Sequence, residues 1–155
     1  MTNSEADREL VITRLFTAPR SLLFKVWTEP NHVAHWWGPT GFTLTTTVMD
    51  VRPGGVWRYV MHGPDGTDYD NEVIYTEIVE PERLVYLHGS GQENDPEQFQ
   101  VTATFAQEGS QTKVTLRMVF ASAEMRDKVV REYGAVEGAN QTLDRLAEYL
   151  TDIEK

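Results

Sequence analysis

Aromatic, sulfur-containing and polar side chains share one face of a strand that the sequence predicts at 56–62. Trp57, Tyr59 and Met61 alternate along it, and alternate residues of a strand point to the same side. Such side chains either fill an ordinary core or line an apolar pocket, and their types favour neither interpretation. A ligand in a pocket needs a few polar groups for orientation. The candidates for that role, each of which is also common in a core or on a surface, are Tyr75, Tyr86 and His88.

Two later strands and a tryptophan pair pose the same choice between core and pocket. The inward-facing residues of these strands are Phe99, Val101, Met118 and Phe120. Trp36 and Trp37 are adjacent, so both cannot face the same way at the end of a helix. One is expected to pack inside, and Trp37 is the candidate for covering the mouth of a cavity. The alternative is a packing anchor under the following loop.

Two further arrangements could support metal binding or acid–base chemistry, and both have simpler interpretations. His32 and His35 have the i, i+3 spacing of some metal sites, but no third ligand lies nearby in the sequence, so no metal is expected. Glu72, beside Asn71, could act as an acid or base if an apolar cavity held it. A solvated position on the outer face of the sheet is the simpler expectation.

The sequence contains none of the common catalytic motifs. A G-x-S-x-G nucleophile elbow, a phosphate-binding P-loop and an H-E-x-x-H metal motif are all missing. Their absence does not exclude an enzyme that works mainly by shaping a reactive chain in a pocket.

Composition and charge exclude several classes of protein. The chain has 155 residues, no cysteine and a formal net charge of −10. Without cysteine it has no disulfide, thiolate nucleophile or zinc finger, and the acidic excess disfavours nucleic acids and anionic membranes as partners. The N-terminus lacks the apolar segment of a secretory signal, and no apolar run approaches the roughly 20 residues that span a bilayer. We therefore expect a cytoplasmic protein without membrane insertion.

Turn residues and apolar periodicity divide the chain into a flexible tail at 1–8 and one domain at 9–155. A strand at 9–16 precedes two short helices, at 19–28 and 31–36. Six β-rich segments separated by turn residues follow. The last two alternate most clearly between apolar and polar residues, as is typical of an antiparallel sheet with one buried face. These strands are expected at 42–50, 56–62, 69–79, 84–88, 98–105 and 113–120, with a loop at 89–97 and a short helix at 123–132.

A long helix from about Tyr133 onward carries one narrow apolar stripe. Its members recur at spacings of three and four residues and are Val136, Ala139, Leu143, Leu146, Leu150 and Ile153. Seven strands at about 4.8 Å each make a sheet about 30 Å wide, whereas a helix is about 10 Å across. The sheet must therefore curl around the helix, and any gap becomes a pocket. The fold class is α+β.

Several separated motifs resemble one family of small bacterial proteins. They are Ala18-Pro19-Arg20, Val26-Trp27-Thr28-Glu29-Pro30, Trp36-Trp37-Gly38-Pro39, Asp50-Val51-Arg52-Pro53-Gly54-Gly55, Pro81-Glu82-Arg83-Leu84, and Gly138 with Gln141-Thr142-Leu143-Asp144-Arg145-Leu146. In order and spacing they are similar to the proteins related to the C-terminal domain of the heat-shock protein 90 ATPase activator, in the START/SRPBCC superfamily. The resemblance extends over nearly the whole chain, from about residue 9 to residue 153.

The resemblance implies the helix-grip fold of START-like and Bet v-like proteins, in which a curved seven-stranded sheet wraps around the C-terminal helix. It also implies a deep, mostly apolar cavity between sheet and helix. The residues expected to contribute from the helix side are Tyr133, Gly138 and Leu143. A Trp often follows the helical Gly of the family, and here Ala139 takes its place, which would leave more room beside the helix.

Three hypotheses about function follow, because the resemblance does not imply a single one. The preferred one is non-enzymatic binding of a small hydrophobic molecule, without a cofactor. The second is a cyclase, dehydratase or hydrolase that uses Tyr, His or Glu side chains in the same cavity. The third is a protein-interaction module like the chaperone activator. In that case the acidic surface of this chain would bind a basic partner. A monomer or a homodimer is expected.

Overall fold

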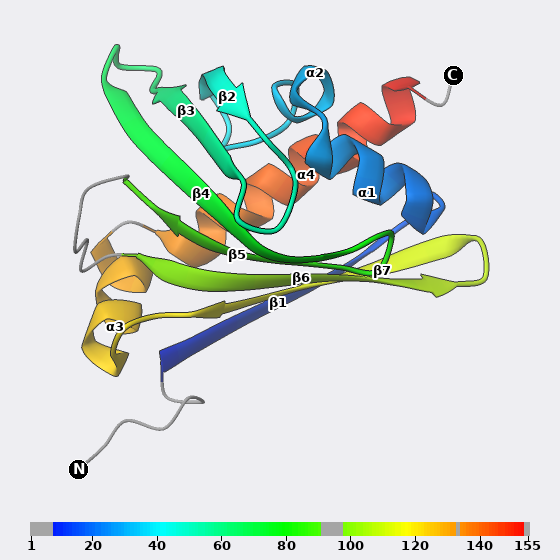
Figure 1. Ribbon diagram of the computed structural model, residues 1–155. Helices are drawn as coiled ribbons and strands as arrows, with labels where there is room; N and C mark the ends of the chain where they lie inside the picture. The colour runs from blue at the N-terminus through cyan, green and yellow to red at the C-terminus, as the bar shows by residue number, and fades with distance from the viewer. Residues whose placement is uncertain (1–7, 91–97, 133, 154–155) are drawn as a thin grey trace.

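A seven-stranded antiparallel sheet and one long helix dominate the computed structural model (Figure 1), which describes residues 8–90, 98–132 and 134–153. The strands, in their order across the sheet, are β1 (Glu9–Phe16), β7 (Gln111–Val119), β6 (Phe99–Glu108), β5 (Arg83–Gly89), β4 (Asp68–Val79), β3 (Val56–His62) and β2 (Thr43–Met49). The helices are α1 (Arg20–Thr28), α2 (Pro30–Val33), α3 (Ala123–Glu132) and α4 (Ala135–Ile153). The α+β helix-grip architecture predicted from the sequence is confirmed.

Some of the predicted segments lie outside the described residues. They are the tail apart from Arg8, the loop residues 91–97, and Tyr133. Within the described ranges, no helix combines the length and the apolar composition needed to cross a bilayer.

Strands β6 and β7 show why the sheet has one buried face. Val101, Ala103 and Phe105 alternate along β6 with more exposed residues, and all three are buried. In the register of the two strands Val101 faces Met118 and Ala103 faces Leu116. Apolar residues opposite one another on neighbouring strands thus form a continuous apolar surface, which has to be covered.

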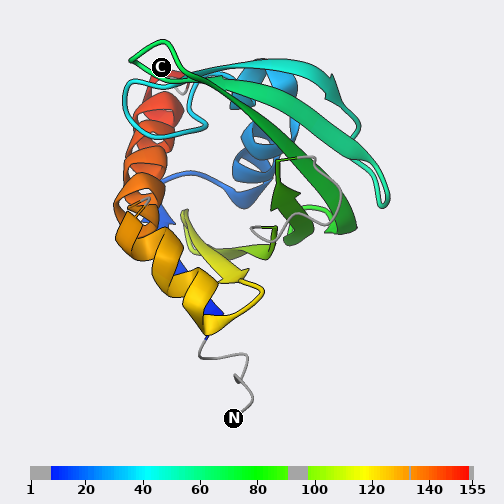
Figure 2. The same cartoon turned by 90° about the vertical axis from the view of Figure 1, so that its left-hand side faces the viewer.

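The sheet is strongly curved, and two irregularities in its ladders contribute to the curvature. The pairing shifts between Thr46 and Val48 in β2 and between Tyr75 and Glu77 in β4. Bulges of this kind bend a strand and increase its twist. Figure 2 shows the result, a curled sheet with α4 running along its concave side.

Helix α1 and the turn that follows α2 fill one end of the concave side with aromatic side chains. The ring centroid of Trp27 lies 5.3 Å from that of Phe105 on β6 and 4.8 Å from that of Trp36. Phe24 contacts Phe105 edge-on at 5.9 Å. The indole N–H of Trp36, which is fully buried, donates a hydrogen bond to the Val26 carbonyl at 3.1 Å. This end of the molecule is therefore closely packed.

Helix α4 buries only the middle of its predicted apolar stripe. Leu143, Leu146 and Leu150 are buried, with exposed fractions of 1%, 0% and 4%. Val136 and Ile153 are 38% and 37% exposed. The concave face of the sheet therefore covers only the central turns of the helix.

The second short helix ends earlier than the sequence predicts. α2 stops at Val33, whereas the prediction extends it to Trp36. Over the next residues the hydrogen bonds tighten from the i−4 to the i−3 pattern, with His35 N–H bonding to His32 and Trp36 N–H to Val33. Such tightening is common where a helix ends.

Candidate functional site

A cavity of about 360 Å³ lies between the concave face of the sheet and the first half of α4. Its walls come from strands β3 to β7, from the loop that follows α2, and from α3 and α4. The residues expected from the sequence that do line it are Trp37, Tyr59, Met61, Tyr86, His88, Phe99, Val101, Met118, Phe120, Gly138 and Leu143. That these residues contact a ligand remains a prediction.

Two of the expected residues lie in the core and do not line the cavity. Trp57 is 2% exposed, stacks on Tyr59 with ring centroids 4.2 Å apart, and donates a hydrogen bond to the Thr46 hydroxyl. Trp37 packs against it edge-on at 5.0 Å, so the Trp57 end of β3 is already filled. Tyr75 packs edge-on against Tyr86 at 6.1 Å and is also buried. Tyr133 lies outside the described residues.

Other lining residues were not proposed from the sequence, and they are Gly38, Pro39, Asn71, Leu116, Val129, Gly134, Ala139 and Thr142. Alternation could have identified two of them. Asn71 is two residues from the buried Val73, and Leu116 lies between the inward-facing Val114 and Met118. The loop and α3 residues carry no such signal, because their position depends on how distant elements pack.

Two adjacent residues of β4 lie on opposite faces of the sheet, one at the cavity and one on the outer surface. Asn71 lines the cavity, whereas Glu72 points outward and pairs with Arg58 at 2.8 Å. The outer-face position of Glu72 agrees with the simpler expectation, but its ion-paired side chain is only 16% exposed and is therefore not fully solvated. The amide of Asn71, rather than a carboxylate, is the group that this strand offers to the cavity.

Four polar side chains form a continuous hydrogen-bonded cluster in one wall of the cavity. The indole N–H of Trp37 donates to the Tyr59 hydroxyl at 2.9 Å. That hydroxyl lies 3.0 Å from Nε2 of His88, and Nε2 lies 3.3 Å from Oδ1 of Asn71. The register of the sheet produces this convergence, since Tyr59 on β3 faces Asn71 on β4, and β5 brings His88 alongside.

The tyrosines that line the cavity stay protonated. Burial raises the pKa of Tyr59 far above its usual range, and the hydrogen bond from Trp37 offsets only part of this effect. Burial also raises the pKa of Tyr86, again with a smaller opposing contribution, from the Trp27 indole. No Asp, Glu, Lys or Arg occurs among the described residues that line the cavity. Its phenols are therefore hydrogen-bonding groups and not anions.

Arg145 of α4 holds the loop that carries Trp37. Its Nη1 donates to the carbonyl oxygens of Gly38 at 2.8 Å, Pro39 at 3.1 Å and Trp37 at 3.4 Å. Burial lowers the pKa of Arg145 and Glu148 opposes this shift, but a guanidinium stays charged in proteins. The positive charge thus binds three carbonyl oxygens of the loop, of which that of Pro39 also accepts from the backbone N–H of Phe42.

Gly38 in this loop has a structural requirement for glycine. Its backbone φ angle is 101°, a value that residues with a side chain rarely adopt. An added Cβ would also lie 2.9 Å from the sulfur of Met61. The close approach places the Trp37–Pro39 segment directly against the cavity wall. Of the two tryptophans, Trp36 is buried in the core and Trp37 lines the cavity. That Trp37 covers the mouth of the cavity stays a prediction.

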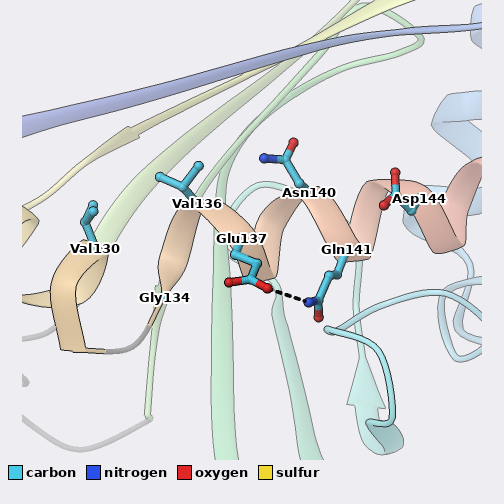
Figure 3. A pocket seen from close by; sticks show the side chains of 7 residues that line it. All are labelled: Val130, Gly134, Val136, Glu137, Asn140, Gln141 and Asp144. Atoms are coloured by element: carbon cyan, nitrogen blue, oxygen red, sulfur yellow. Dashed lines mark hydrogen bonds between the residues drawn. The ribbon is translucent and has the colours of Figure 1, made fainter.

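A second hollow, of about 550 Å³, lies on the outside of α3 and α4 (Figure 3) and is lined by Val130, Gly134, Val136, Glu137, Asn140, Gln141 and Asp144. Val136, Asn140 and Asp144 point to one side of α4. Glu137 and Gln141 point to another side and are joined by a hydrogen bond of 3.3 Å. These side chains do not converge on one point, so the inner cavity is the better candidate site although the outer hollow is larger.

The histidines of α2 and the following turn make contacts away from the cavity. Nδ1 of His32 lies 2.6 Å from the Tyr149 hydroxyl, and Nε2 lies 3.6 Å from Glu29. His35 stacks on the Tyr149 ring at 5.1 Å. Within the described part of the chain, no three His, Cys, Asp or Glu side chains are grouped so that they could hold a metal ion.

A curled antiparallel sheet that encloses an apolar cavity together with a C-terminal helix defines the START/SRPBCC class of folds, which is known for ligand binding. Within this class, the chain belongs to the family described as Activator of Hsp90 ATPase homolog 1-like protein, whose model matches residues 17–151. The family resemblance inferred from the sequence motifs is thereby confirmed.

Solved bacterial structures share the fold over nearly their full length. Protein Ms6760 from Mycobacterium smegmatis is 28% identical, with 98% of this chain and 96% of that chain covered and a TM-score of 0.86. A protein from Arthrobacter aurescens is 25% identical over 96% of this chain and 89% of that chain, with a TM-score of 0.87. Protein NE0264 from Nitrosomonas europaea, at 24% identity and a TM-score of 0.86 over 97% and 99% of the two chains, supports the fold alone. No curated protein shows significant similarity to the chain.

Proposed function

We propose that this protein binds a small, mainly apolar molecule in the cavity beside α4, without converting it chemically. The observation that carries the proposal is the cavity, with about 360 Å³ of space lined mostly by apolar and aromatic side chains. Protein cores rarely contain voids larger than a water molecule. Small-molecule sites usually measure about 300–1,000 Å³, so the space suits a ligand of modest size.

The distribution of polar groups also supports binding of an oriented ligand. Tyr59, His88 and Asn71 meet in one wall, while Phe99, Met118 and other apolar side chains form most of the remaining surface. A ligand would bury its apolar body against the apolar side chains, and one polar group would fix its direction. The membership of the chain in a ligand-binding class of folds points the same way.

A fluorescence titration with Nile red, an uncharged apolar dye, tests the proposal. Wild type should bind the dye with an increase in emission. Ala139→Trp should abolish binding, because Ala139 lines the cavity and an indole there would occupy it. Val136→Trp is the matched control on the same helix, since Val136 is 38% exposed and does not line the cavity.

The thermal unfolding midpoints of both variants show whether each one folds. The proposal fails if wild type binds neither Nile red nor any member of a panel of hydrophobic metabolites in native mass spectrometry. It also fails if a folded Ala139→Trp protein binds the dye as tightly as wild type, because the dye would then be bound elsewhere.

The polar cluster favours a second candidate function, an enzyme of the cyclase, dehydratase or hydrolase type. Tyr59 and His88 are 3.0 Å apart in a cavity, and paired side chains of this kind can transfer protons. The test is to incubate each bound metabolite with wild type and with His88→Gln and to analyse the released compound by mass spectrometry. Conversion by wild type alone supports the enzyme, and release of unchanged compound from both proteins supports simple binding.

A further inference from the structure

The carboxamide of Asn71 is held in one orientation, and this fixes the direction of the hydrogen bonds in the cavity wall. Its Nδ2 donates to the backbone carbonyl of Tyr69 at 3.1 Å. Because the nitrogen of the amide is engaged there, the atom that faces His88 at 3.3 Å is the oxygen, Oδ1. An amide oxygen can only accept hydrogen bonds.

The proton on the imidazole of His88 can be assigned from this orientation. Two oxygen atoms, Oδ1 of Asn71 and the Tyr59 hydroxyl oxygen, approach Nε2 at 3.3 and 3.0 Å. If Nε2 carried no proton, its lone pair would face the lone pairs of the amide oxygen, which is repulsive. Nε2 therefore carries the proton and shares it between the two oxygens.

The Tyr59 hydroxyl then accepts two hydrogen bonds, and its own O–H donates none to the described part of the chain. One donor is the indole N–H of Trp37 at 2.9 Å, and the other is Nε2–H of His88. Among the described residues no further acceptor lies within hydrogen-bond distance of this hydroxyl. Tyr59 lines the cavity and is 2% exposed, so its O–H is a buried donor that faces the ligand space.

We propose that the Tyr59 O–H recognises a carbonyl oxygen at one end of an uncharged, otherwise apolar ligand. This inference rests on the proposed function, because it specifies which kind of molecule the same cavity binds. A buried donor without a partner is unfavourable, so a ligand that supplies an acceptor gains more than one that supplies only apolar surface. The two donors that polarise the Tyr59 oxygen also strengthen its O–H as a donor.

The lining of the cavity favours binding of a ketone or an aldehyde over binding of a carboxylate. A carboxylate would also accept from Tyr59, but it would bring a charge into a space without any Lys or Arg among its described lining residues. Transfer of an unpaired charge from water into such surroundings is very costly. A carbonyl group supplies the acceptor without this penalty.

Three naphthalene derivatives that differ at one ring position test the proposal by isothermal titration calorimetry. They are acetonaphthone, isopropylnaphthalene and naphthoate, which have the same number of non-hydrogen atoms and represent a ketone, a hydrocarbon and an anion. For wild type we expect the ketone to bind about tenfold more tightly than the hydrocarbon, as one net hydrogen bond allows. The anion should bind more weakly than either.

Two variants assign the preference to one hydroxyl group. Tyr59→Phe should bind the ketone and the hydrocarbon equally, because the donor is gone while the ring remains. Tyr75→Phe is the matched control, since Tyr75 is equally buried, lies on the neighbouring strand and does not line the cavity. It should keep the full preference for the ketone. Hydrocarbon binding by Tyr59→Phe shows that this variant retains the cavity.

The outcomes distinguish the inference from the function on which it rests. Equal binding of ketone and hydrocarbon by wild type, or a ketone preference that survives in Tyr59→Phe, overturns the role of Tyr59 and leaves apolar ligand binding intact. If wild type binds none of the three probes and also fails the Nile red titration, the proposed function fails, and the inference fails with it.

Discussion

The two ends of the concave side of the sheet are formed by similar apolar strands, but one end is closely packed and the other contains a cavity. Beneath α1 and α2, Trp27 packs against both Trp36 and Phe105, and all three rings are buried. Beside the first half of α4, residues such as Phe120 and Met118 line a cavity of about 360 Å³. Both ends are formed by the same strands, β6 and β7, which continue from one into the other.

The difference arises from what covers each end. Two helices, with Trp27 of α1 and Trp36 of the turn after α2, occupy the first end. The second end is covered by α4 where it carries Gly138, Ala139 and Thr142. Small side chains on the covering helix cannot reach the floor of the curved sheet. The cavity therefore depends on the helix sequence as much as on the sheet, and variants that exchange large and small residues should affect the two ends differently.

A pair of phenylalanine truncations should give the largest contrast. Phe105→Ala removes a ring that is packed on all sides, and we expect a loss of about 3–5 kcal/mol of unfolding free energy. Phe120→Ala removes a ring that already faces the cavity and has fewer neighbours to lose, so we expect roughly half that loss. Urea unfolding monitored by circular dichroism measures both. Equal losses would show that the second end is as tightly packed as the first.

The reverse exchange, from a small to a large side chain, should give a smaller difference in unfolding free energy between the two ends. Ala103 is fully buried in the core, and Ala103→Leu should cost about 1–3 kcal/mol through overpacking. Ala139→Leu adds the same atoms where space is available, so its unfolding free energy should equal or exceed that of wild type. The same urea experiment compares them. Destabilisation of Ala139→Leu by as much as Ala103→Leu would argue against an open cavity.

Removal of the arginine that holds the cavity loop should have a moderate effect on stability. Arg145→Gln loses the charge and the hydrogen bonds to the carbonyls of Gly38 and Pro39, and we expect a cost of about 1–3 kcal/mol. Arg52→Gln is the control, because Arg52 is largely exposed and pairs with the neighbouring Asp50. Chemical denaturation gives the stability, and the NMR signal of the Trp37 indole N–H reports on the loop. An unchanged indole signal in Arg145→Gln would show that the arginine does not position Trp37.

The parts of the fold that follow from local pattern could be predicted from the sequence. The bounds expected for β1 and β3 agree with the structure, because each segment is rich in β-branched and aromatic residues and is followed by turn residues. The end of α2 was predicted too late, since Ala34–Trp36 retain helix-like spacing while their hydrogen bonds change to the tighter pattern. Periodicity identifies an element, and hydrogen bonds determine where it ends.

The site was less predictable, because it depends on contacts between distant segments. Trp57 and Tyr59 share a face of β3, yet one is core and the other lines the cavity, depending on where Trp37 packs. The hydrogen bonds from Arg145 join residues more than one hundred positions apart. Alternation places a side chain on a face of the sheet, but only tertiary packing determines whether that part of the face is covered.

Replacement of the buried tyrosines should change stability least near neutral pH. At high pH the same replacements test most directly whether the cavity wall excludes water. Burial raises the pKa of Tyr59 and Tyr75 in the folded state, whereas an unfolded tyrosine titrates near pH ~10. Above that pH the unfolded chain loses protons that the folded chain retains, so stability present below pH ~10 is lost as pH rises. Tyr59→Phe and Tyr75→Phe should each reduce this decline, measured as the urea midpoint between about pH 8 and about pH 11.

The exposed Tyr69, which is 48% exposed on β4, supplies the control. Tyr69→Phe is measured alongside the other two variants, because it removes a solvent-exposed phenol in place of a buried one. If water filled the cavity, the Tyr59 phenolate would be hydrated too, and only Tyr75→Phe would reduce the decline. A reduction by both variants therefore requires that the cavity wall at Tyr59 excludes water as effectively as the packed core at Tyr75, which is the condition under which an apolar ligand would gain most from entering.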